Sequence, residues 1–366
     1  MTPCTACLRR ARLVGLLSAR IAAELAERRR AAPILALPDE QLVRAVGGSL
    51  KGAAWRMLET FDPSQSLDEI QAAGLHGVCR HDPLYPARLR DLGDPPALLF
   101  STASPQRLAE LCAAPAVAIV GTRRASTYGL EVASALGRGL GAAGVTVVSG
   151  LALGVDAAAH RGALDAAGPT VGVLGCGADT VYPRTNRTLY GRVRAEGAVV
   201  SELPPGQPPA RWTFPARNRI MAGIARVIVV VEAAKRSGSL ITAGFAEDLG
   251  REICAVPGRV TSRIAAGVNQ LLVDGAHLVR GPEDVLDLLF GAGGWEGLAS
   301  DKHSAEASLE RPLRRVLRSV ENGDSVDDAA RGAQLSASEL RAALGQLELL
   351  GLIRRDRLGA YERVAR

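Results

Sequence analysis

Six short apolar runs alternate with helical stretches between residues 116 and 290, and this alternation constrains the fold more than any other feature. The runs are AVAIVG, VTVVSG, TVGVLG, AVVSEL, RVIVVVEA and EICAVPG. Strands that alternate with helices are typical of βαβ units, in which helices cover both faces of a parallel sheet. Such strands are buried on both faces, and they are therefore apolar along their whole length, as these runs are. We predict an α/β fold with a Rossmann-like parallel sheet domain over residues 86–292.

Two smaller domains are predicted on either side of the sheet domain. Residues 1–85 show helical periodicity and predict a small helical domain, similar to SAM or helix-hairpin-helix domains. The segment HDPLYPARLRDLGDPPALLF contains four prolines and predicts an extended connection at the boundary. After the glycine-rich segment GAGGWEG, residues 305–366 predict three helices and two strands around a turn, which is the order of a winged helix.

The charges of the predicted winged helix do not favour duplex binding over other roles. Its recognition segment, LSASELRAALGQLELLG, contains two acidic residues, Glu339 and Glu348, and one basic residue, Arg341. The basic residues Arg354, Arg355 and Arg357 lie in the wing instead. A protein contact or a regulatory role is as consistent with this pattern as a major-groove contact.

The composition is that of a globular protein with a basic balance. Hydrophobic residues make up 47% and charged residues 22%, which excludes a disordered or fibrous chain. The formal net charge of +6 is compatible with a polyanionic partner but does not identify one.

The six cysteines do not form the dense framework of a small secreted protein, so we expect a reduced, cytoplasmic setting. Cys4 and Cys7 form one CxxC motif, but no second Cys or His pair follows nearby at zinc spacing. We therefore predict no metal ion and no cofactor. The segment from Arg12 to Leu25 is interrupted by Arg20 and Glu24, which excludes a secretory signal or a membrane-spanning helix there.

The loops that follow the predicted strands are the candidate binding site. Ligands of open parallel sheets bind at the carboxyl ends of the strands, where these loops converge. The first two loops combine glycine, hydroxyl and arginine, which suits a phosphate because glycine lets the backbone approach and arginine can bind it in a bidentate manner. Their candidate residues are Gly121, Thr122, Arg123, Ser149 and Gly150.

The third and fourth loops add more arginines and aromatic rings. Their candidate residues are Arg184, Asn186, Phe214, Arg217, Asn218 and Arg219, with Tyr182 and Trp212 close by in the sequence. Arginines and amides suit phosphates, and rings suit unstacked bases. We therefore predict a single-stranded nucleic acid as the ligand, because a single mononucleotide would need less positive charge.

A GxGxxG pattern at Gly139, Gly141 and Gly144 does not indicate a dinucleotide site. The dinucleotide fingerprint follows a strand and opens a helix, whereas this pattern ends a helical run and precedes a strand. We interpret these glycines as helix packing and a turn.

Several other residues have two open interpretations. Asp156 is either a helix cap or a ligand contact, and His160 is favoured as a packed helix residue over a catalytic base. Trp212 and Phe214 are either core residues or stacking platforms. Glu232 is the best candidate for a catalytic carboxylate, but we expect it to pair with an arginine, because no second carboxylate or nucleophile lies at a motif spacing.

Three segments resemble the DNA-processing protein A family, also called Smf. They are FPARNRIMAG, VIVVVEAAKRSGSLITAGFAEDLGREICAVPG and GVNQLLVDGAHLV. The resemblance implies a protein without enzymatic activity that binds single-stranded DNA, protects it and loads the RecA recombinase onto it during natural transformation and recombination. It also implies a homodimer formed through the sheet domain. The same four loops, from Thr122 to Arg219, are the ones that the family uses around the DNA backbone.

Two positions depart from the family pattern. Thr122 stands where serine is commoner, and Leu153 stands where the family usually has arginine, which removes a charge beside the expected phosphate path. The alternative function is a Rossmann-type nucleotide-binding or nucleotide-hydrolysing protein. Its PGGxGT-type motif is absent, since the nearest segment reads KRSGSLITAG.

Overall fold

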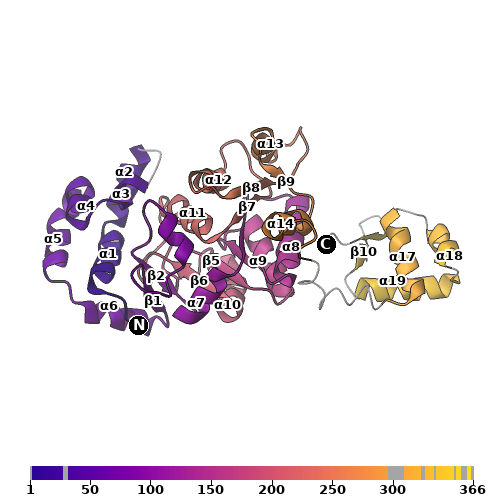
Figure 1. Ribbon diagram of the computed structural model, residues 1–366, viewed down its shortest axis with the longest axis horizontal. Coiled ribbons are helices and arrows are strands. Elements are labelled where there is room, and N and C mark those ends of the chain that lie inside the picture. The colour runs from indigo at the N-terminus through magenta and orange to yellow at the C-terminus, as the bar shows by residue number, and fades with distance from the viewer. Residues whose placement is uncertain are drawn as a thin grey trace. The chain divides into compact units, whose positions relative to one another are not determined.

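The computed structural model of the protein describes residues 2–27, 32–295, 309–322, 326–333, 335–349, 352–355 and 361–363. These residues form two compact units, Met1–Ala292 and Gly293–Arg366, shown in Figure 1. The division falls in the glycine-rich segment that the sequence marks as a linker, whose last two residues lie outside the described residues.

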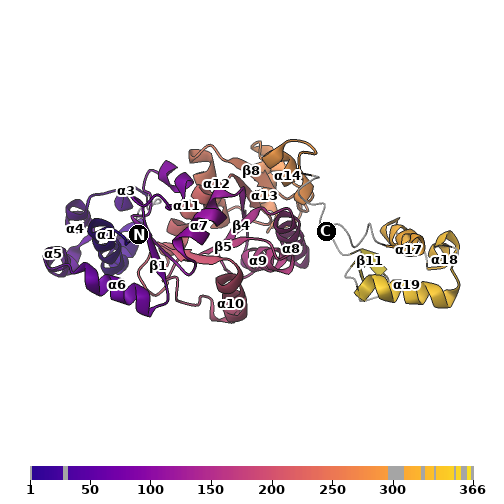
Figure 2. The ribbon, with the colours of Figure 1, turned by 60° about the horizontal axis from the view of Figure 1, so that its bottom comes forward.

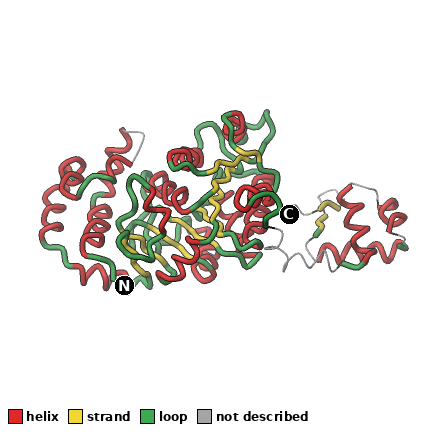
Figure 3. Tube along the Cα trace, viewed as in Figure 1, coloured by secondary structure: helices red, strands yellow, loops and turns green. Residues whose placement is uncertain are grey.

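A nine-stranded sheet with the order β1-β2-β6-β5-β4-β3-β7-β8-β9 forms the centre of the first unit. Its strands are the yellow segments of that unit in Figure 3. Its strands are β1 (His76–Cys79), β2 (Leu98–Ser101), β3 (Ala116–Val120), β4 (Thr146–Ser149), β5 (Thr170–Val173), β6 (Ala198–Ser201), β7 (Val227–Val230), β8 (Glu252–Ala255) and β9 (His277–Leu278). Strands β3 to β9 pair in parallel, and β1 and β2 add an antiparallel edge beside β6. The predicted Rossmann-like α/β fold is confirmed.

All six predicted strands are present, as β3 to β8, and they are apolar because helices cover the sheet on both sides. These helices are α7 (Pro105–Ala113), α8 (Thr127–Ala142), α9 (Val155–Asp165), α10 (Arg187–Glu196), α11 (Thr213–Ile224), α12 (Ser239–Asp248), α13 (Ala266–Val273) and α14 (Pro282–Phe290), with short 3-10 turns η2 (Ala87–Asp91) and η3 (Arg184–Asn186). Figures 1 and 2 show α8, α9 and α10 on one face and α11, α12 and α13 on the other.

The chain changes direction across the sheet at β3. From β3 the connections run outward through β4, β5 and β6, and then α11 returns the chain to β7 on the other side of β3. The boundary between β3 and β7 is therefore the topological switch point of the sheet. In open α/β sheets a crevice opens there, outside the carboxyl ends of the strands.

The glycines of the GxGxxG pattern have the packing role expected of them. Gly139 and Gly141 lie in the last turns of α8, where a Cβ would press on Pro282 and Ala163 respectively. Gly144 has a φ of 76° in the turn before β4. The pattern follows no strand, and it is not a dinucleotide fingerprint.

Helices α1 (Thr5–Leu16), α2 (Ser18–Glu27), α3 (Ala32–Leu35), α4 (Asp39–Val46), α5 (Lys51–Glu59) and α6 (Pro63–Ala72), with the turn η1 (Gly48–Leu50), form the N-terminal part. Their apolar residues pack on Leu203, Trp212 and Ala216, so this part shares a core with the sheet domain. Strand β1 begins at His76, inside the segment assigned to the helical domain, so the sheet starts earlier than the sequence predicts.

The N-terminal CxxC motif lies beside a second pair of residues, a cysteine and a histidine, whose side chains are of the types that bind metal ions. Sulfur or nitrogen atoms of Cys4, Cys7, Cys79 and His81 all lie within 4.8 Å of one another. The prediction of no metal site considered only nearby sequence, whereas this second pair is brought in by the end of β1.

The second unit contains α17 (Arg311–Asn322), α18 (Val326–Ala333), α19 (Ala337–Leu349), β10 (Ile353–Arg355) and β11 (Tyr361–Arg363). The two strands pair antiparallel, and Val316, Leu344 and Ile353 lie in a small common core. This is the order of elements expected for a winged helix. Arg355 is exposed and lies 5.0 Å from the Tyr361 ring centroid, and Arg357 lies outside the described residues. Over the described part of the chain, no helix combines the length and apolar character that crossing a bilayer requires.

Candidate nucleic-acid interface

An open cleft of about 340 Å³ lies at the carboxyl end of β3 and β7, at the switch point of the sheet. We call it the switch-point cleft. It is lined by residues 121–123 after β3, by Phe214, Arg217 and Asn218 of α11, and by residues 237–239 after β7. Two loops and a helix that are far apart in sequence therefore meet where the topology predicts a ligand site.

An aromatic pair with an arginine beside it forms the rim of this cleft. The ring centroids of Tyr182 and Phe214 are 5.4 Å apart at an interplanar angle of 40°, and the Arg123 guanidinium carbon lies 4.8 Å from the Phe214 centroid. The Tyr182 side chain is exposed and Phe214 is half-buried. Tyr182, Phe214 and Arg123 line a second, small hollow of about 70 Å³, which Gly150 and Leu153 also line.

Exposed cations lie in the segments that follow β3, β5, β6 and β7, at the carboxyl edge of the sheet, and Arg123 among them lines the cleft. They are Arg123, Arg124, Arg184, Arg187, Arg211, Lys235 and Arg236. Because they come from four loops of one sheet edge, they give that edge a positive potential that attracts polyanions.

Arg217 lies beneath the cleft and is buried, with only 6% of its surface exposed. Its guanidinium donates to the carbonyl oxygens of Gly150, at 2.6 Å, and of Val173, and lies 3.6 Å from the Asp156 carboxylate. Burial lowers the pKa of Arg217, and Asp156 opposes that shift. Arg217 therefore joins the β4 and β5 loops to α9 and α11, and Gly150 has no room for a side chain because that guanidinium occupies it.

Asn218 and Asn186 also fasten loops together. Asn218 accepts from Arg217 Nε and donates to the carbonyl of Gly238, while Asn186 donates to the carbonyl of Leu151 at 2.9 Å. Both amides are buried, so they position the loops around the cleft.

The loop after β3 is not an open phosphate cradle. The Thr122 amide donates to the carbonyl of Glu232 at 2.7 Å, the Arg124 amide donates to Thr122 Oγ1, and the Ser126 amide donates to the Glu232 carboxylate. These donors are already paired, because the loop is folded against the end of β7. Arg123 and Arg124 are the exposed positive side chains of this loop, and Arg123 is the one that lines the cleft.

Glu232 does not pair with an arginine as expected. Its carboxylate accepts from the amide and, at 2.6 Å, from the hydroxyl of Ser126, which caps α8. The expectation failed because Glu232 points across to the neighbouring β3 loop, where the helix N-terminus supplies the donors.

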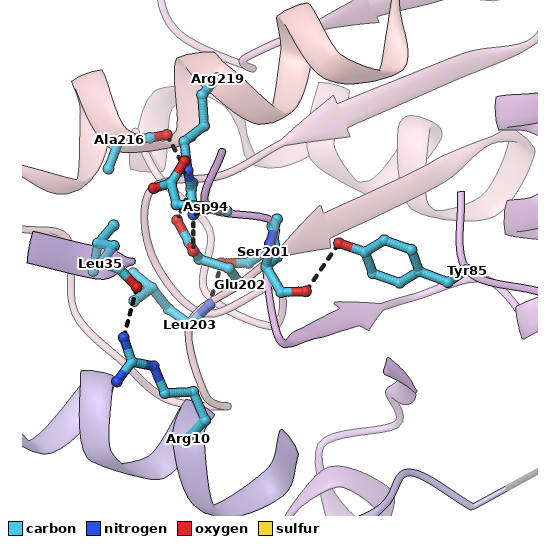
Figure 4. A network of polar contacts seen from close by, with 10 residues as sticks. Arg10, Leu35, Tyr85, Asp94, Ser201, Glu202, Leu203, Ala216 and Arg219 are labelled. Carbon is cyan, nitrogen blue, oxygen red and sulfur yellow. Dashed lines mark hydrogen bonds and ion pairs between the residues drawn. The ribbon is translucent and has the colours of Figure 1, made fainter. Parts of the chain in front are cut away.

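Two further predicted residues do not face the cleft. Ser149 is fully buried and donates to the carbonyl of Ile119 at 2.6 Å. Arg219 is buried on another side of α11, where it pairs with Asp94 at 2.9 Å and with both carboxylate oxygens of Glu202 at 2.7 Å (Figure 4). Burial alone would lower the pKa of Arg219, but the two carboxylates raise it above its ordinary value.

The open interpretations of four residues are resolved by their surroundings. Asp156 lies in the first turn of α9 and pairs with Arg217 instead of capping the helix; burial raises its pKa. His160 is a packed helix residue, as expected. Its ring nitrogen Nδ1 and Thr170 Oγ1 are joined by a hydrogen bond of 2.7 Å. Trp212 is a core residue that donates to Ser18 Oγ, whereas Phe214 lies on the cleft.

The loop that follows β7 is part of the site, although it is not among the residues predicted from the sequence. Ser237, Gly238 and Ser239 line the cleft, and exposed Lys235 and Arg236 precede them. The rule that ligands bind after the carboxyl ends of strands would have found this loop, because it follows the apolar run RVIVVVEA directly.

A family comparison matches this sheet domain. The model described as DNA recombination-mediator protein A matches residues 76–290, from β1 to α14. The chain belongs to this family. Two relatives are a protein Smf of Synechocystis, 31% identical over 86% of this chain and 89% of that protein, and a DNA processing protein DprA of Bacillus subtilis, 34% identical over 71% and 88%.

Solved structures of family members have the same fold. The DNA processing protein A of Streptococcus pneumoniae is similar with a TM-score of 0.62 and 30% identity, covering 79% of this chain and 99% of that one. A DNA processing protein A of Helicobacter pylori, described for its single-stranded DNA binding mode, is similar with a TM-score of 0.53 and 28% identity, covering 59% of this chain and 97% of that one.

Proposed function

We propose that the protein binds single-stranded DNA across the carboxyl edge of the sheet. The single observation that carries this proposal is the grouping of Tyr182, Phe214 and Arg123, of which Phe214 and Arg123 line the switch-point cleft and all three line the small hollow beside it. Rings that are open to solvent stack unpaired bases, and an arginine beside them binds the adjoining phosphate. In a duplex the bases are already stacked, so this rim favours a single strand.

The contacts that we propose are fewer than the sequence suggests. Arg123, Arg184 and Phe214 would meet the strand directly, together with the other exposed cations of this sheet edge, whereas Gly121 and Thr122 would line the cleft. Gly150, Asn186, Arg217 and Asn218 would shape the cleft from beneath. Support comes from the Helicobacter pylori relative, whose structure is described for its mode of binding single-stranded DNA.

We further propose that the protein protects the bound strand in the cytoplasm and helps to load the RecA recombinase onto it during transformation and recombination. The family description as a recombination mediator supports this role. No covalent chemistry is proposed at the cleft. Its acidic residue, Asp156, is ion-paired with Arg217, and the nearby Glu232 accepts a hydrogen bond from the hydroxyl of Ser126, the N-cap residue of α8.

A homodimer through the sheet domain is part of the same proposal. Val273, the last residue of α13, and Leu278 of the edge strand β9 have 81% and 51% of their surface exposed. Unpaired strand edges with apolar neighbours favour association with another chain. Sedimentation equilibrium of the wild type and of a Val273→Lys variant tests this: a dimer that the variant weakens supports the assignment, and a monomeric wild type overturns it.

Fluorescence anisotropy with a labelled oligo-dT tests the binding proposal. Tight binding that an unlabelled single strand competes and that duplex DNA and a mononucleotide compete poorly is the expected result. No binding to the oligonucleotide, together with a mononucleotide that raises the melting temperature, would overturn it in favour of a nucleotide-binding protein.

A further inference from the structure

Three cysteines and a histidine form a cluster where the N-terminal helices meet the sheet. Cys4 precedes the first residue of α1 and Cys7 lies in its first turn, so the two sulfurs lie on the same side of the helix end. Cys79 is the last residue of β1, and His81 lies in the turn that follows. Although Cys7 and His81 are 74 positions apart in sequence, the packing of α1 on β2 and α6 brings the two pairs together.

The distances within the cluster fit tetrahedral coordination. His81 Nδ1 lies 3.4 Å from the Cys4 sulfur and 3.5 Å from the Cys7 sulfur. Zinc bonds of about 2.3 Å to sulfur and about 2.0 Å to nitrogen place neighbouring tetrahedral ligands roughly 3.5–3.8 Å apart. All four ligand atoms lie within 4.8 Å of one another, so small side-chain movements suffice to close them around one ion.

The surroundings favour a structural site. Cys7 and Cys79 are buried in an apolar cluster with Leu8, Ile70 and Leu98, while Cys4 and His81 close the outer side. Three thiolates with one zinc ion carry a net charge of −1, and Arg80, between two of the ligands in sequence, contributes a compensating positive charge to this site. A complete set of four protein ligands leaves no position for substrate.

We propose that Cys4, Cys7, Cys79 and His81 bind one zinc ion that fastens the N-terminal helices to the edge of the sheet. The soft thiolate ligands select zinc over calcium or magnesium. The ion would join the start of α1 to the end of β1, two elements that share an apolar cluster, whereas the ion pair between Arg12 and Glu69 links α1 to α6. The site is separate from the switch-point cleft, and its test does not depend on DNA binding.

Metal analysis of the purified full-length chain tests the proposal. We expect one zinc ion per chain, and on replacement with Co²⁺ we expect the visible absorption of tetrahedral cobalt with a thiolate charge-transfer band. Cys7→Ser and His81→Ala should each lower the affinity for zinc at least tenfold. Cys254→Ser is the matched control, because Cys254 is buried elsewhere, in β8, and should keep the full zinc content.

Cobalt uptake by the wild type does not depend on how well a variant folds. A folded wild type that takes up neither added zinc nor cobalt would overturn the proposal, as would a disulfide within the cluster after purification under reducing conditions. If the site has the proposed role, a chelator should lower the melting temperature and speed proteolysis within residues 1–75, and added zinc should restore both. Full zinc content in both ligand variants would also contradict the assignment.

Discussion

Arg123 and Arg217 lie at the same cleft in opposite environments. Arg123 is exposed beside a ring, whereas Arg217 is buried and paired with Asp156 and two backbone carbonyls. An exposed arginine that meets a phosphate contributes to the salt dependence of binding. A buried arginine acts through the fold, because removing it leaves an uncompensated carboxylate.

We expect Arg123→Ala to weaken oligo-dT binding and to reduce the slope of log affinity against log salt by about 1. Anisotropy titrations between about 50 mM and about 200 mM salt measure this slope. Arg138→Ala is the matched control, since Arg138 is exposed near the opposite end of α8. Equal slopes for wild type and Arg123→Ala would remove Arg123 from the interface.

Phe214→Ala should weaken single-strand binding by about 1–3 kcal/mol, because a base loses its stacking partner. Phe214→Tyr keeps the ring and should bind nearly as well as the wild type. The same titration at fixed salt compares the two variants. Equal losses in both would mean that the ring does not stack a base.

His160 should make stability depend on pH. Burial lowers its pKa from 6.5 to about 3, so the folded state holds it neutral over a range in which the unfolded chain binds a proton. The free energy of unfolding should therefore fall as pH drops below about 6.5, by up to about 1.4 kcal/mol per pH unit until about pH 3. Denaturant titrations at about pH 7 and about pH 5 measure this slope. A His160→Asn variant with an unchanged slope would assign the effect to other groups.

Helix α11 contacts several separate parts of the first unit, each through a different face. Phe214 lies on the cleft, Trp212 just before the helix packs among the N-terminal helices, and Arg219 reaches Asp94 before β2 and Glu202 after β6 (Figure 4). Consecutive helix residues point about 100° apart, so one helix can serve several partners.

Arg219→Ala should destabilise the first unit by about 3–5 kcal/mol, because it leaves Asp94 and Glu202 buried without their partner. Thermal unfolding measures the loss. The double substitution Asp94→Asn with Glu202→Gln tests the cause, since adding it to Arg219→Ala should recover part of the stability. A variant that unfolds like the wild type but no longer binds DNA would show instead that Arg219 meets the strand.

The pattern of burial explains which strands of the sheet could be predicted from the sequence. The β3 to β8 strands were predictable because doubly buried parallel strands are apolar throughout. Strands β1 and β2 were not, since four prolines lie between them and the edge is antiparallel, and β9 is only two residues long.

For the site, the position of the loops was predictable and the direction of their side chains was not. The sequence predicts that all three residues of Arg217–Arg219 contact DNA, but adjacent helix residues cannot all face one cleft. Ser149 ends a strand with its hydroxyl turned to the neighbouring β3. The Cys4 cluster depends on a contact between distant segments, which spacing within a short window does not reveal.

In the full-length protein, we expect a single strand of DNA to cross the switch-point cleft. Photo-crosslinking of the full-length protein to an oligonucleotide with scattered 5-iodouracil bases, followed by peptide mapping, tests it most directly, because the halogenated base reacts with the aromatic ring it stacks on. We predict crosslinks concentrated at Tyr182 and Phe214 and lost in Phe214→Ala. Crosslinks confined to the second unit, in 309–363, with none on these two rings would contradict the account.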